Sequence, residues 1–349
     1  METICILDTS ICTDNLGDII IMDAVNNVVG SLFPNAYVHR IPTHEALSDR
    51  TRKWIGESKC CFIGGTNLIS SRISRHGLWR IDLDDAELFS TSELVALGVG
   101  WNDYGPGPIE QTTRILKTAL SSRFNHSVRD GHTLTHLSSI LPNVVNTSCP
   151  TTWGLTPSHC ASIRYSRAKA VVLTLSAWRA DPESDRALLS AMRDLYSEVM
   201  FFPQMQDDLK YMRQFGFDDI RIIPPNLDAY NTLLESEEVD FVGTRLHGGV
   251  RALQRRQRAL ILAIDNRATE IARDTGLPVV PRTDIEAIRN WVVVAPTAEI
   301  SLPQKSIDGW KSQFSEQVLS DLAAPPGWHP PRGAKKVRKM VREAKRILT

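Results

Sequence analysis

The stretch Val239-Asp-Phe-Val-Gly-Thr-Arg-Leu-His-Gly-Gly-Val-Arg251 runs from an apolar strand into an arginine and a histidine before a helix begins. Residues 239–242 combine β-branched and aromatic side chains over a length typical of a buried strand. The glycines that flank Thr-Arg-Leu-His permit a sharp turn and a close approach of the backbone to a ligand. This order predicts an α/β unit with Arg245 and His247 at the carboxyl end of its strand.

Arg245 and His247 are the chemically informative pair in this stretch. Residues two apart share a face in extended backbone, so we expect the guanidinium and the imidazole to address one bound molecule. Ligands of open parallel sheets bind in the crevice beyond the carboxyl ends of the strands. Arginine suits a phosphate or a carboxylate, and histidine gains or loses a proton near neutral pH. The alternative is an arginine that caps some carboxylate and a histidine that packs in the core.

Strand-like and helix-like runs alternate along the whole chain, which predicts parallel strands joined by crossover helices. We predict strands near residues 4–7, 60–63, 94–99, 170–175, 198–202, 220–223, 239–242 and 259–264. Helices are predicted near residues 18–32, 109–121, 184–196, 207–215, 229–236, 249–256 and 268–275. We therefore expect an α/β protein with two Rossmann-like, doubly wound domains facing across a cleft. The expected division is an N-terminal domain (1–160), a C-terminal domain (161–300) and an extension (301–349).

Composition narrows the class of protein. The 349 residues include 40 Lys or Arg and 40 Asp or Glu, a balance that argues against a nucleic-acid binder. The N-terminus lacks the pattern of a signal peptide, and no apolar run approaches the ~20 residues that span a bilayer, so we expect a cytoplasmic protein. Six cysteines without C-x-x-C spacing predict reduced, mostly buried thiols and no structural metal.

The C-terminal tail departs from this charge balance. Residues 331–349 hold eight Lys or Arg and one Glu, and their apolar residues recur at helical spacing. A basic amphipathic helix binds anionic membrane surfaces, where each cation contributes ~1 kcal/mol. Residues 332–349 are thus a candidate peripheral membrane contact at the inner face of a membrane. A solvated helix that packs on the body of the protein and a disordered end are the alternatives.

Three predicted strand ends in the N-terminal half carry glycine: Asn15-Leu-Gly-Asp18, Gly64-Gly-Thr-Asn67 and Gly98-Val-Gly100. None matches the G-x-G-x-x-G or Walker pattern, which argues against binding of NAD or of ATP in a P-loop. Asp18 is either a helix N-cap or a base for a ligand hydroxyl. Arg129 follows a short strand-like run and either pairs with Asp130 on the surface or faces a ligand.

Together these elements resemble the polysaccharide pyruvyl transferase family. The matching segments are Asn15-x-Gly-Asp18, Gly64-Gly65, Val128-Arg-Asp130, Gln204, Gly243-Thr-Arg-Leu-His-Gly248 and the stretch 264–278. The resemblance covers about residues 1–295, and the Arg-Leu-His block with its sequel is its most specific part. It implies a glycosyltransferase-B-like fold. The implied reaction transfers pyruvate from phosphoenolpyruvate (PEP) to a sugar of a cell-surface polysaccharide or its lipid-linked precursor, which forms a cyclic ketal and releases phosphate.

The resemblance also implies roles for individual residues. The family's catalytic histidine falls on His247, its PEP-binding arginine on Arg129, and the arginine of its Arg-x-His motif on Arg245. A downstream lysine of the family is replaced by Arg267, which keeps the charge but supplies a planar fork. Two departures are the Gly64-Gly-Thr-Asn67 turn, which the family makes more glycine-rich, and Cys149-Pro-Thr-Thr152, where an acidic residue is expected.

In the implied reaction, Arg129, Arg245 and Arg267 bind PEP, with the PEP site in the C-terminal domain. His247 protonates the methylene carbon of PEP, and Asp18 is the base or the orienter for the acceptor hydroxyl. Acceptor or backbone anion contacts are expected from Asn15, Gly17, Gly64, Gly65, Asn67, Gln204 and Gly248. The expected partners are PEP and a saccharide or lipid-linked saccharide, with neither metal nor redox cofactor. Two alternatives stay open: a glycosyltransferase of the same fold that uses a nucleotide-sugar donor, and a non-catalytic component of polysaccharide assembly.

Overall fold

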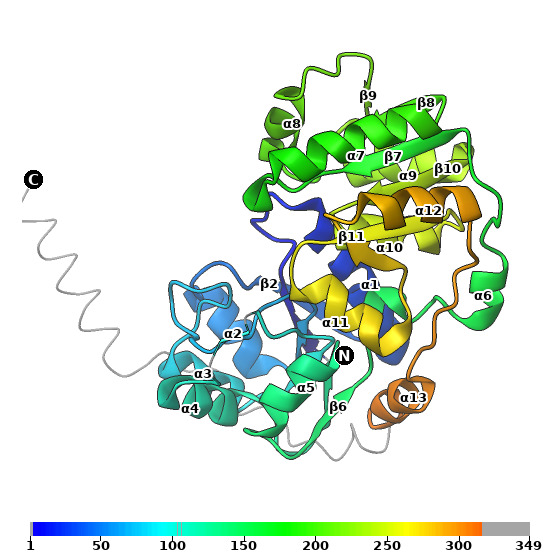
Figure 1. The fold of residues 1–349 in the computed structure, drawn as a ribbon. Helices are drawn as coiled ribbons and strands as arrows, with labels where there is room; N and C mark the ends of the chain where they lie inside the picture. Colours follow the sequence, from blue (N-terminus) through cyan, green and yellow to red (C-terminus); the bar gives the residue numbers. More distant parts are fainter. Residues whose placement is uncertain (1–2, 103, 106, 316–349) are drawn as a thin grey trace, which may run out of the picture.

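The computed structural model describes residues 3–102, 104–105 and 107–315, which form two α/β domains (Figure 1). The basic tail and its candidate membrane contact at 332–349 lie outside the described residues. Within the described part, none of the helices combines the length and the apolar character needed to traverse a bilayer.

The first domain is built on a parallel sheet with the strand order β2-β1-β3-β4. Its strands are β1 (Thr3–Asp8), β2 (Tyr37–Pro42), β3 (Cys60–Gly64) and β4 (Leu94–Leu97), and the parallel pair β5 (His126–Val128) and β6 (Val144–Asn146) adjoins them through a bridge between Val99 and Val128. Its helices are α1 (Leu16–Leu32), α2 (Asp49–Glu57), α3 (Leu83–Phe89), α4 (Glu110–Ala119) and α5 (Gly131–Ser138). The chain then passes through a 3-10 turn, η1 (Pro150–Thr152), and α6 (Pro157–Ala161).

The second domain has a parallel sheet with the order β12-β11-β10-β7-β8-β9. Its strands are β7 (Ala170–Thr174), β8 (Glu198–Phe201), β9 (Arg221–Ile222), β10 (Val239–Gly243), β11 (Ala259–Ala263) and β12 (Val279–Pro281). The intervening helices are η2 (Ala177–Arg179, a 3-10 turn), α7 (Pro182–Leu195), α8 (Gln206–Arg213), α9 (Leu227–Ser236), α10 (Leu246–Gln254), α11 (Asn266–Thr275) and α12 (Ile285–Val294). Parallel sheets in two facing domains confirm the predicted α/β, glycosyltransferase-B-like fold.

The central strands of both sheets are buried on both faces, as crossover helices require. In β1, Cys5 and Leu7 point into one apolar cluster while Ile4 and Ile6 point into another, which is the period of two expected of a strand. The second sheet repeats this arrangement. The cores therefore lie above and below each sheet, and the strand ends are left free to carry polar side chains.

The chain crosses between the domains more than once. Cys149, Leu155 and Cys160 fall within the predicted first domain (1–160), but they pack in the core of the second domain. Helix α13 (Gln304–Ser312) then returns to the first domain, where Trp310 and Phe314 join the cluster around Phe62. These two crossings join the domains through apolar cores as well as through polar contacts.

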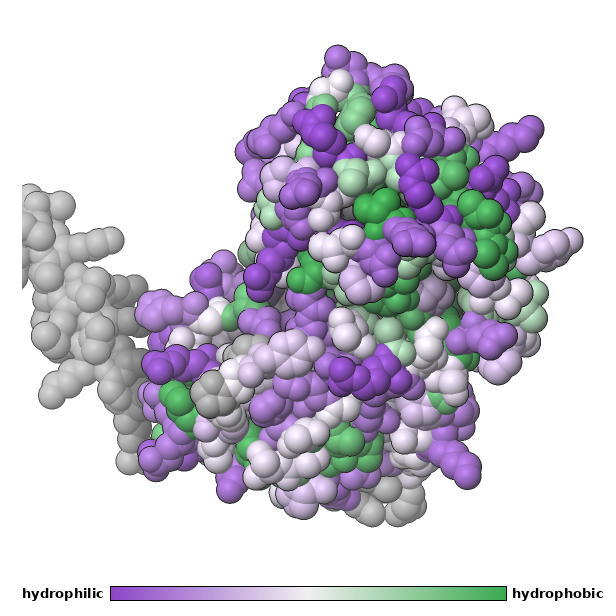
Figure 2. All heavy atoms as spheres, viewed as in Figure 1, coloured by the Kyte–Doolittle hydropathy of each residue, from purple (hydrophilic) through white to green (hydrophobic). Residues whose placement is uncertain are grey.

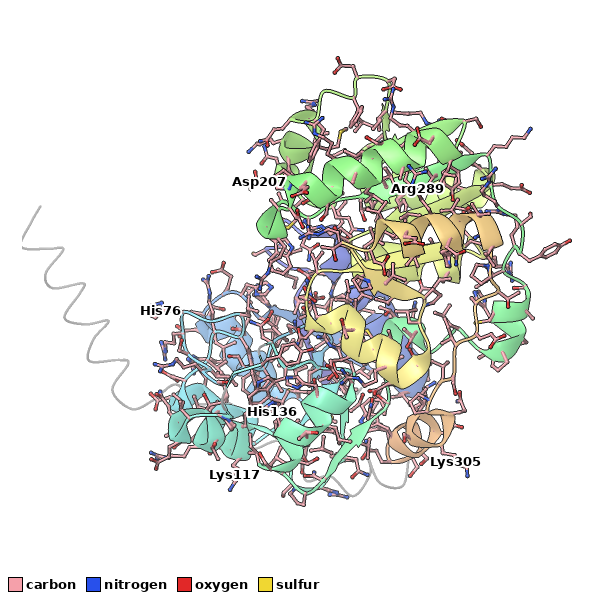
Figure 3. All side chains as sticks on the ribbon, viewed as in Figure 1. His76, Lys117, His136, Asp207, Arg289 and Lys305 are labelled. Atoms are coloured by element: carbon pink, nitrogen blue, oxygen red, sulfur yellow. The ribbon has the colours of Figure 1, made fainter. Side chains whose placement is uncertain are left out.

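The outer surface contrasts with these cores. The face in Figure 2 is largely hydrophilic, and hydrophobic side chains gather on it over α12, where Val293 and Val294 are exposed. Lys117 points outward from α4 (Figure 3), and Arg289 on α12 forms an ion pair with Asp194 on α7. Ion pairs of this kind, for example Arg289 with Asp194 at 2.8 Å, are exposed and contribute little to stability.

Candidate active site

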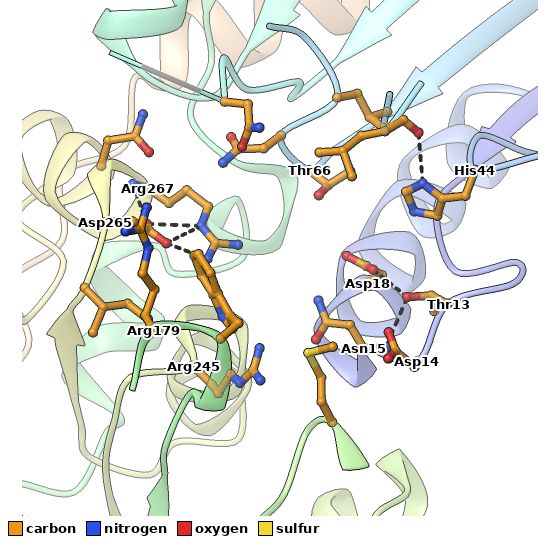
Figure 4. A pocket seen from close by; sticks show the side chains of 18 of the residues that line it. Thr13, Asp14, Asn15, Asp18, His44, Thr66, Arg179, Arg245, Asp265 and Arg267 are labelled. Atoms are coloured by element: carbon orange, nitrogen blue, oxygen red, sulfur yellow. Dashed lines mark hydrogen bonds and ion pairs between the residues drawn. The ribbon is translucent and has the colours of Figure 1, made fainter. Parts of the chain in front are cut away.

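The carboxyl ends of both sheets open on one cleft of about 1160 Å³ between the domains (Figure 4). From the first domain it is lined by the loops that follow β1, β2, β3 and β4. The second domain contributes the segments that follow β7, β8, β10, β11 and β12. This is the crevice in which doubly wound α/β proteins bind ligands.

His247 lies in the first turn of α10, because that helix begins at Leu246 rather than near Gly249 as the sequence predicts. The extended backbone expected for Arg245 and His247 is therefore absent, and their side chains point to different partners. The imidazole is buried, and its Nε2 lies 3.8 Å from the Sγ of Cys149. Cys149 precedes η1, the turn where the family resemblance leads us to expect an acidic residue.

The surroundings of His247 favour its neutral form. Burial is the main cause, and the charges of Arg129 and Arg267 add to it, so that the pKa falls from 6.5 to about 3. Asp265 opposes this shift. Arg129 belongs to the first domain and the other residues to the second, so only the tertiary fold brings these charges near one another. His247 and Arg129 do not themselves line the cleft.

Arg129 is fully buried beyond the end of β5. Its Nε donates to Asp130 at 3.1 Å, and its terminal nitrogen donates to the Oδ1 of Asn67, which lines the cleft. The pair with Asp130 thus exists, but it is buried rather than on the surface. Gly100 makes room for the guanidinium, since a Cβ there would lie 2.4 Å from its central carbon.

Arg245 lines the cleft, yet its guanidinium is bound to the carboxylate of Asp208. The Nε donates to Oδ2 at 3.0 Å and a terminal nitrogen donates to the same oxygen at 2.6 Å. Asp208 also accepts from the backbone N–H groups of Met205 and Ala177. Arg245 therefore holds together the turns after β7, β8 and β10, which is the alternative that the sequence leaves open for it.

Arg267 occupies the first turn of α11 and pairs with the N-cap of that helix, Asp265. Its Nε donates to both carboxylate oxygens, at 3.1 and 3.0 Å. Burial raises the pKa of Asp265, but the hydrogen bonds and the charge of Arg267 outweigh burial and leave it lowered. Both side chains line the cleft, where Arg267 also lies 5.3 Å from the centre of the Trp178 ring.

Asp18 stands in the cleft wall opposite Arg245 and Arg267 (Figure 4). The N-cap of α1 is Asn15, whose Oδ1 accepts from the N–H of Gly17 at 3.0 Å, so Asp18 is not the cap. Its Oδ2 accepts from the hydroxyl of Thr13 at 2.7 Å. Burial raises the pKa of Asp18 above its ordinary value despite this hydrogen bond. A carboxylate with a raised pKa accepts a proton more readily, as a general base must.

Three residues predicted from separate segments meet at the domain junction. Gln204 is buried between Gly17 and Gly248, and a Cβ on Gly248 would lie 2.2 Å from its Nε2. Its backbone oxygen accepts from the N–H of Leu16 at 3.0 Å. These two glycines thus allow the domains to approach closely, and none of the three residues lines the cleft.

Gly64 and Gly65 also have a packing role. A Cβ at Gly64 would lie 2.7 Å from Val25, and one at Gly65 would lie 2.1 Å from Ile21, both on α1. Gly65 has a φ of +56°, a conformation that glycine adopts at little cost. The turn therefore lets α1 cover the end of β3, while the ligand side of the turn is formed by Thr66 and Asn67.

Sequence reasoning did not single out several residues of the cleft wall. Trp178 and Arg179 follow β7, Arg80 lies in the loop after β3, and Asp265 precedes Arg267. Trp178 and Arg179 immediately follow a strand that the sequence predicts, so the strand-end argument applied to Arg245 would also have found them. Five of the six cysteines are buried thiols, as predicted, and Cys12 is exposed.

The comparisons with known proteins agree with this geometry. The family model for polysaccharide pyruvyl transferase matches residues 15–266, well over half of the chain. The chain belongs to this family. Its members are transferases that act in polysaccharide pyruvylation, with a saccharide as acceptor and a pyruvate donor. The match includes Asp18, Arg129, Arg245 and His247 and ends one residue before Arg267. No curated protein matches the chain.

Solved structures resemble the chain in fold. A UDP-GlcNAc 2-epimerase of Methanocaldococcus jannaschii, in complex with UDP-GlcNAc and UDP, is 12% identical with a TM-score of 0.51, and the match covers 98% of this chain and 100% of that one. A Listeria monocytogenes protein described as a UDP-N-acetylglucosamine 2-epimerase is 10% identical with a TM-score of 0.55, over 94% and 99% of the two chains. At such identities the likeness concerns the fold alone.

Proposed function

We propose that the protein transfers pyruvate from PEP to two hydroxyls of one sugar in a cell-surface polysaccharide or its lipid-linked precursor. One hydroxyl adds to C2 of PEP while the methylene carbon gains a proton. The oxygen of the second hydroxyl then bonds to C2 and displaces phosphate, which takes up the proton of that hydroxyl. The product is a cyclic ketal, and free phosphate leaves. The observation that carries the proposal is that Asp18, Arg245 and Arg267 line the cleft of a pyruvyl transferase family member. Behind that lining, Arg129 is bonded to the lining residue Asn67, and the charges of Arg129 and Arg267 both act on the buried His247.

PEP is a small anion with a phosphate and a carboxylate, and guanidiniums bind both groups through charge-assisted hydrogen bonds. Arg129 and Arg267 are the cations whose charges lower the pKa of His247, so we assign them the first contacts with PEP. Arg245 completes the set from the cleft wall, with its orientation fixed by Asp208. Each of these arginines already has a carboxylate partner, which holds the fork in place before the ligand arrives.

His247 must be protonated to act as the acid, yet its pKa of about 3 makes it neutral in the free protein. PEP resolves this conflict, because its negative charges offset those of Arg129 and Arg267. A single charge at about 4 Å and an effective dielectric near 20 contributes ~4 kcal/mol, equivalent to roughly 3 pKa units. His247 thus acquires its proton together with PEP, and the acid is formed only when its substrate is present.

Asp18 is assigned to the acceptor side. It faces the arginines across the cleft, and its raised pKa favours removal of the proton from the first sugar hydroxyl. Thr13 donates to one carboxylate oxygen and so leaves the other oriented for that hydroxyl. The proton that the hydroxyl loses to Asp18 and the proton that His247 gives to the methylene carbon balance in the addition step.

The test is phosphate release from PEP by the purified protein with a panel of saccharides, and detection of the ketal methyl group by NMR. We expect release with at least one saccharide, and loss of release in His247→Ala. His126→Gln is the matched control, because His126 is also a buried histidine with a lowered pKa, but neither Arg129 nor Arg267 contributes to its shift. Turnover of a nucleotide-sugar donor in the absence of any reaction with PEP would contradict the proposal.

A further inference from the structure

The turn after β7 places an aromatic ring and a cation side by side in the cleft. Trp178 and Arg179 form part of η2, beyond the carboxyl end of a central strand of the second sheet. Both line the cleft, and Trp178 remains 48% exposed although tryptophan is usually well buried. The Arg179 guanidinium lies 5.2 Å from the centre of the indole ring, and the Arg267 guanidinium lies 5.3 Å from it. Core packing does not explain why this ring is exposed in the cleft.

The backbone of this turn is held rigidly by other elements. The N–H of Ala177 donates to Asp208 at 3.1 Å, and Arg282 donates to the carbonyl of Arg179 at 2.6 Å. Asp208 is fixed in turn by Arg245. The two large side chains are therefore presented to the cleft from a fixed support, which reduces the entropy lost on binding a ligand.

Arg179 differs from the other arginines of the site in its charge pairing. Arg129, Arg245 and Arg267 are each paired with a carboxylate. Within residues 3–102, 104–105 and 107–315, by contrast, the Arg179 guanidinium has no carboxylate partner, and its contact is the face of Trp178. A cation that contacts an aromatic ring keeps its hydrogen-bond donors free for an anion.

We infer that Trp178 and Arg179 form an acceptor subsite that binds an anionic saccharide. The apolar face of the sugar ring packs on the indole, and Arg179 binds the negative group of the sugar. That group is either a phosphate on the anomeric oxygen or a carboxylate on the ring. This inference rests on the proposed function, because it assigns the acceptor to the cleft that also binds PEP.

The test compares the kinetic constants for the acceptor with those for PEP. In Arg179→Ala, we expect KM for an anionic acceptor to rise about 10- to 100-fold, as for loss of a hydrogen bond to a charged group, with KM for PEP within about twofold. Arg179→Lys should recover part of the loss. Trp178→Phe should retain most acceptor binding and Trp178→Ala should lose it. Tyr165→Ala removes an exposed aromatic ring outside the cleft and is the control.

Measuring sugar binding without turnover tests the inference independently of the proposed function. Saturation-transfer NMR with glucose 1-phosphate, glucuronate and methyl glucoside measures binding in the absence of PEP. Binding of either anionic sugar, lost in Arg179→Ala, supports the subsite and tells whether phosphate or carboxylate is recognised. The inference is overturned if the neutral glycoside binds equally well, or if neither anion binds at millimolar concentration. It is also overturned if binding is unchanged in Arg179→Ala, or if that variant raises KM for PEP alone. If the subsite binds but PEP releases no phosphate with any acceptor, the proposed function fails and the subsite stands.

Discussion

His247 offers a quantitative test of the site, because folding should remove its proton and PEP should restore it. In the folded protein burial and the charges of Arg129 and Arg267 lower its pKa from 6.5 to about 3. Below pH 6.5 the unfolded chain gains a proton at His247 that the folded chain does not. Holding His247 neutral therefore costs no stability above pH 6.5, and it lowers the free energy of unfolding progressively as the pH falls from 6.5 towards 3.

The size of the effect follows from the shift. One pKa unit corresponds to 1.36 kcal/mol, so His247 alone should lower the free energy of unfolding by roughly 2 kcal/mol between pH 8 and pH 5. Burial lowers the pKa of His126 to about 4, so that histidine should contribute a similar loss over the same range. The two contributions differ in what they should do when PEP is added.

Urea unfolding followed by tryptophan fluorescence at pH 8 and pH 5 measures these losses. His247→Gln and His126→Gln should each lose about 2 kcal/mol less than the wild type between the two pH values. With PEP, the wild type and His126→Gln should be stabilised more strongly at pH 5 than at pH 8, because PEP binding then carries a proton to His247. His247→Gln should lack this extra stabilisation, and since the phosphate of PEP titrates equally in all three proteins, its own ionisation cancels in the comparison.

Two outcomes would refute the reasoning. If His247→Gln and the wild type lose stability in parallel between pH 8 and pH 5, His247 is not held neutral by the fold. If the pH dependence of PEP stabilisation is the same with and without His247, the histidine does not receive a proton with PEP and is not the acid.

Three further predictions concern the arginines. Arg267→Lys should retain most activity if only charge is needed near PEP, and Arg267→Met should lose it; normal kinetic constants in the Met variant would show that Arg267 is not a PEP ligand. Arg245→Ala should destabilise the fold by about 3–5 kcal/mol, since it leaves Asp208 buried and unpaired, and Asp208→Asn in the same background should restore part of that stability in urea unfolding. Gly100→Ala should displace the Arg129 guanidinium and weaken PEP binding in calorimetry, with unchanged affinity contradicting that packing.

Much of the fold was predictable because its signals are local. Strands such as β3 and β10 are short apolar runs buried on both faces, and the sequence predicts both within one residue of their observed ends. The strand β2 was missed because it is an edge strand whose residues are mostly exposed or half-buried, so it lacks a continuous apolar run. Helix α13 was missed because its packing partner is the first domain, hundreds of residues earlier in the chain.

The candidate site was predictable to the extent that it follows strand ends. Arg129, Arg245 and Arg267 all come after predicted strands, and parallel strands bring such ends to one edge of a sheet. Whether each side chain is free was not predictable. The partner of Arg245 is Asp208, 37 residues away, and the proximity of Arg129 to His247 joins different domains.

The sequence by itself determined the alternation of strands and helices, the Arg-Leu-His motif and the family, because these depend on residue type and short-range spacing. Only the tertiary structure decided the charge state of the site. The pKa of His247 depends on burial and on cations from distant segments, and the pairing of each arginine depends on which carboxylate the fold places beside it. Trp178 and Arg179 are exposed for the same reason, because the packing of the domains leaves their side of the cleft open.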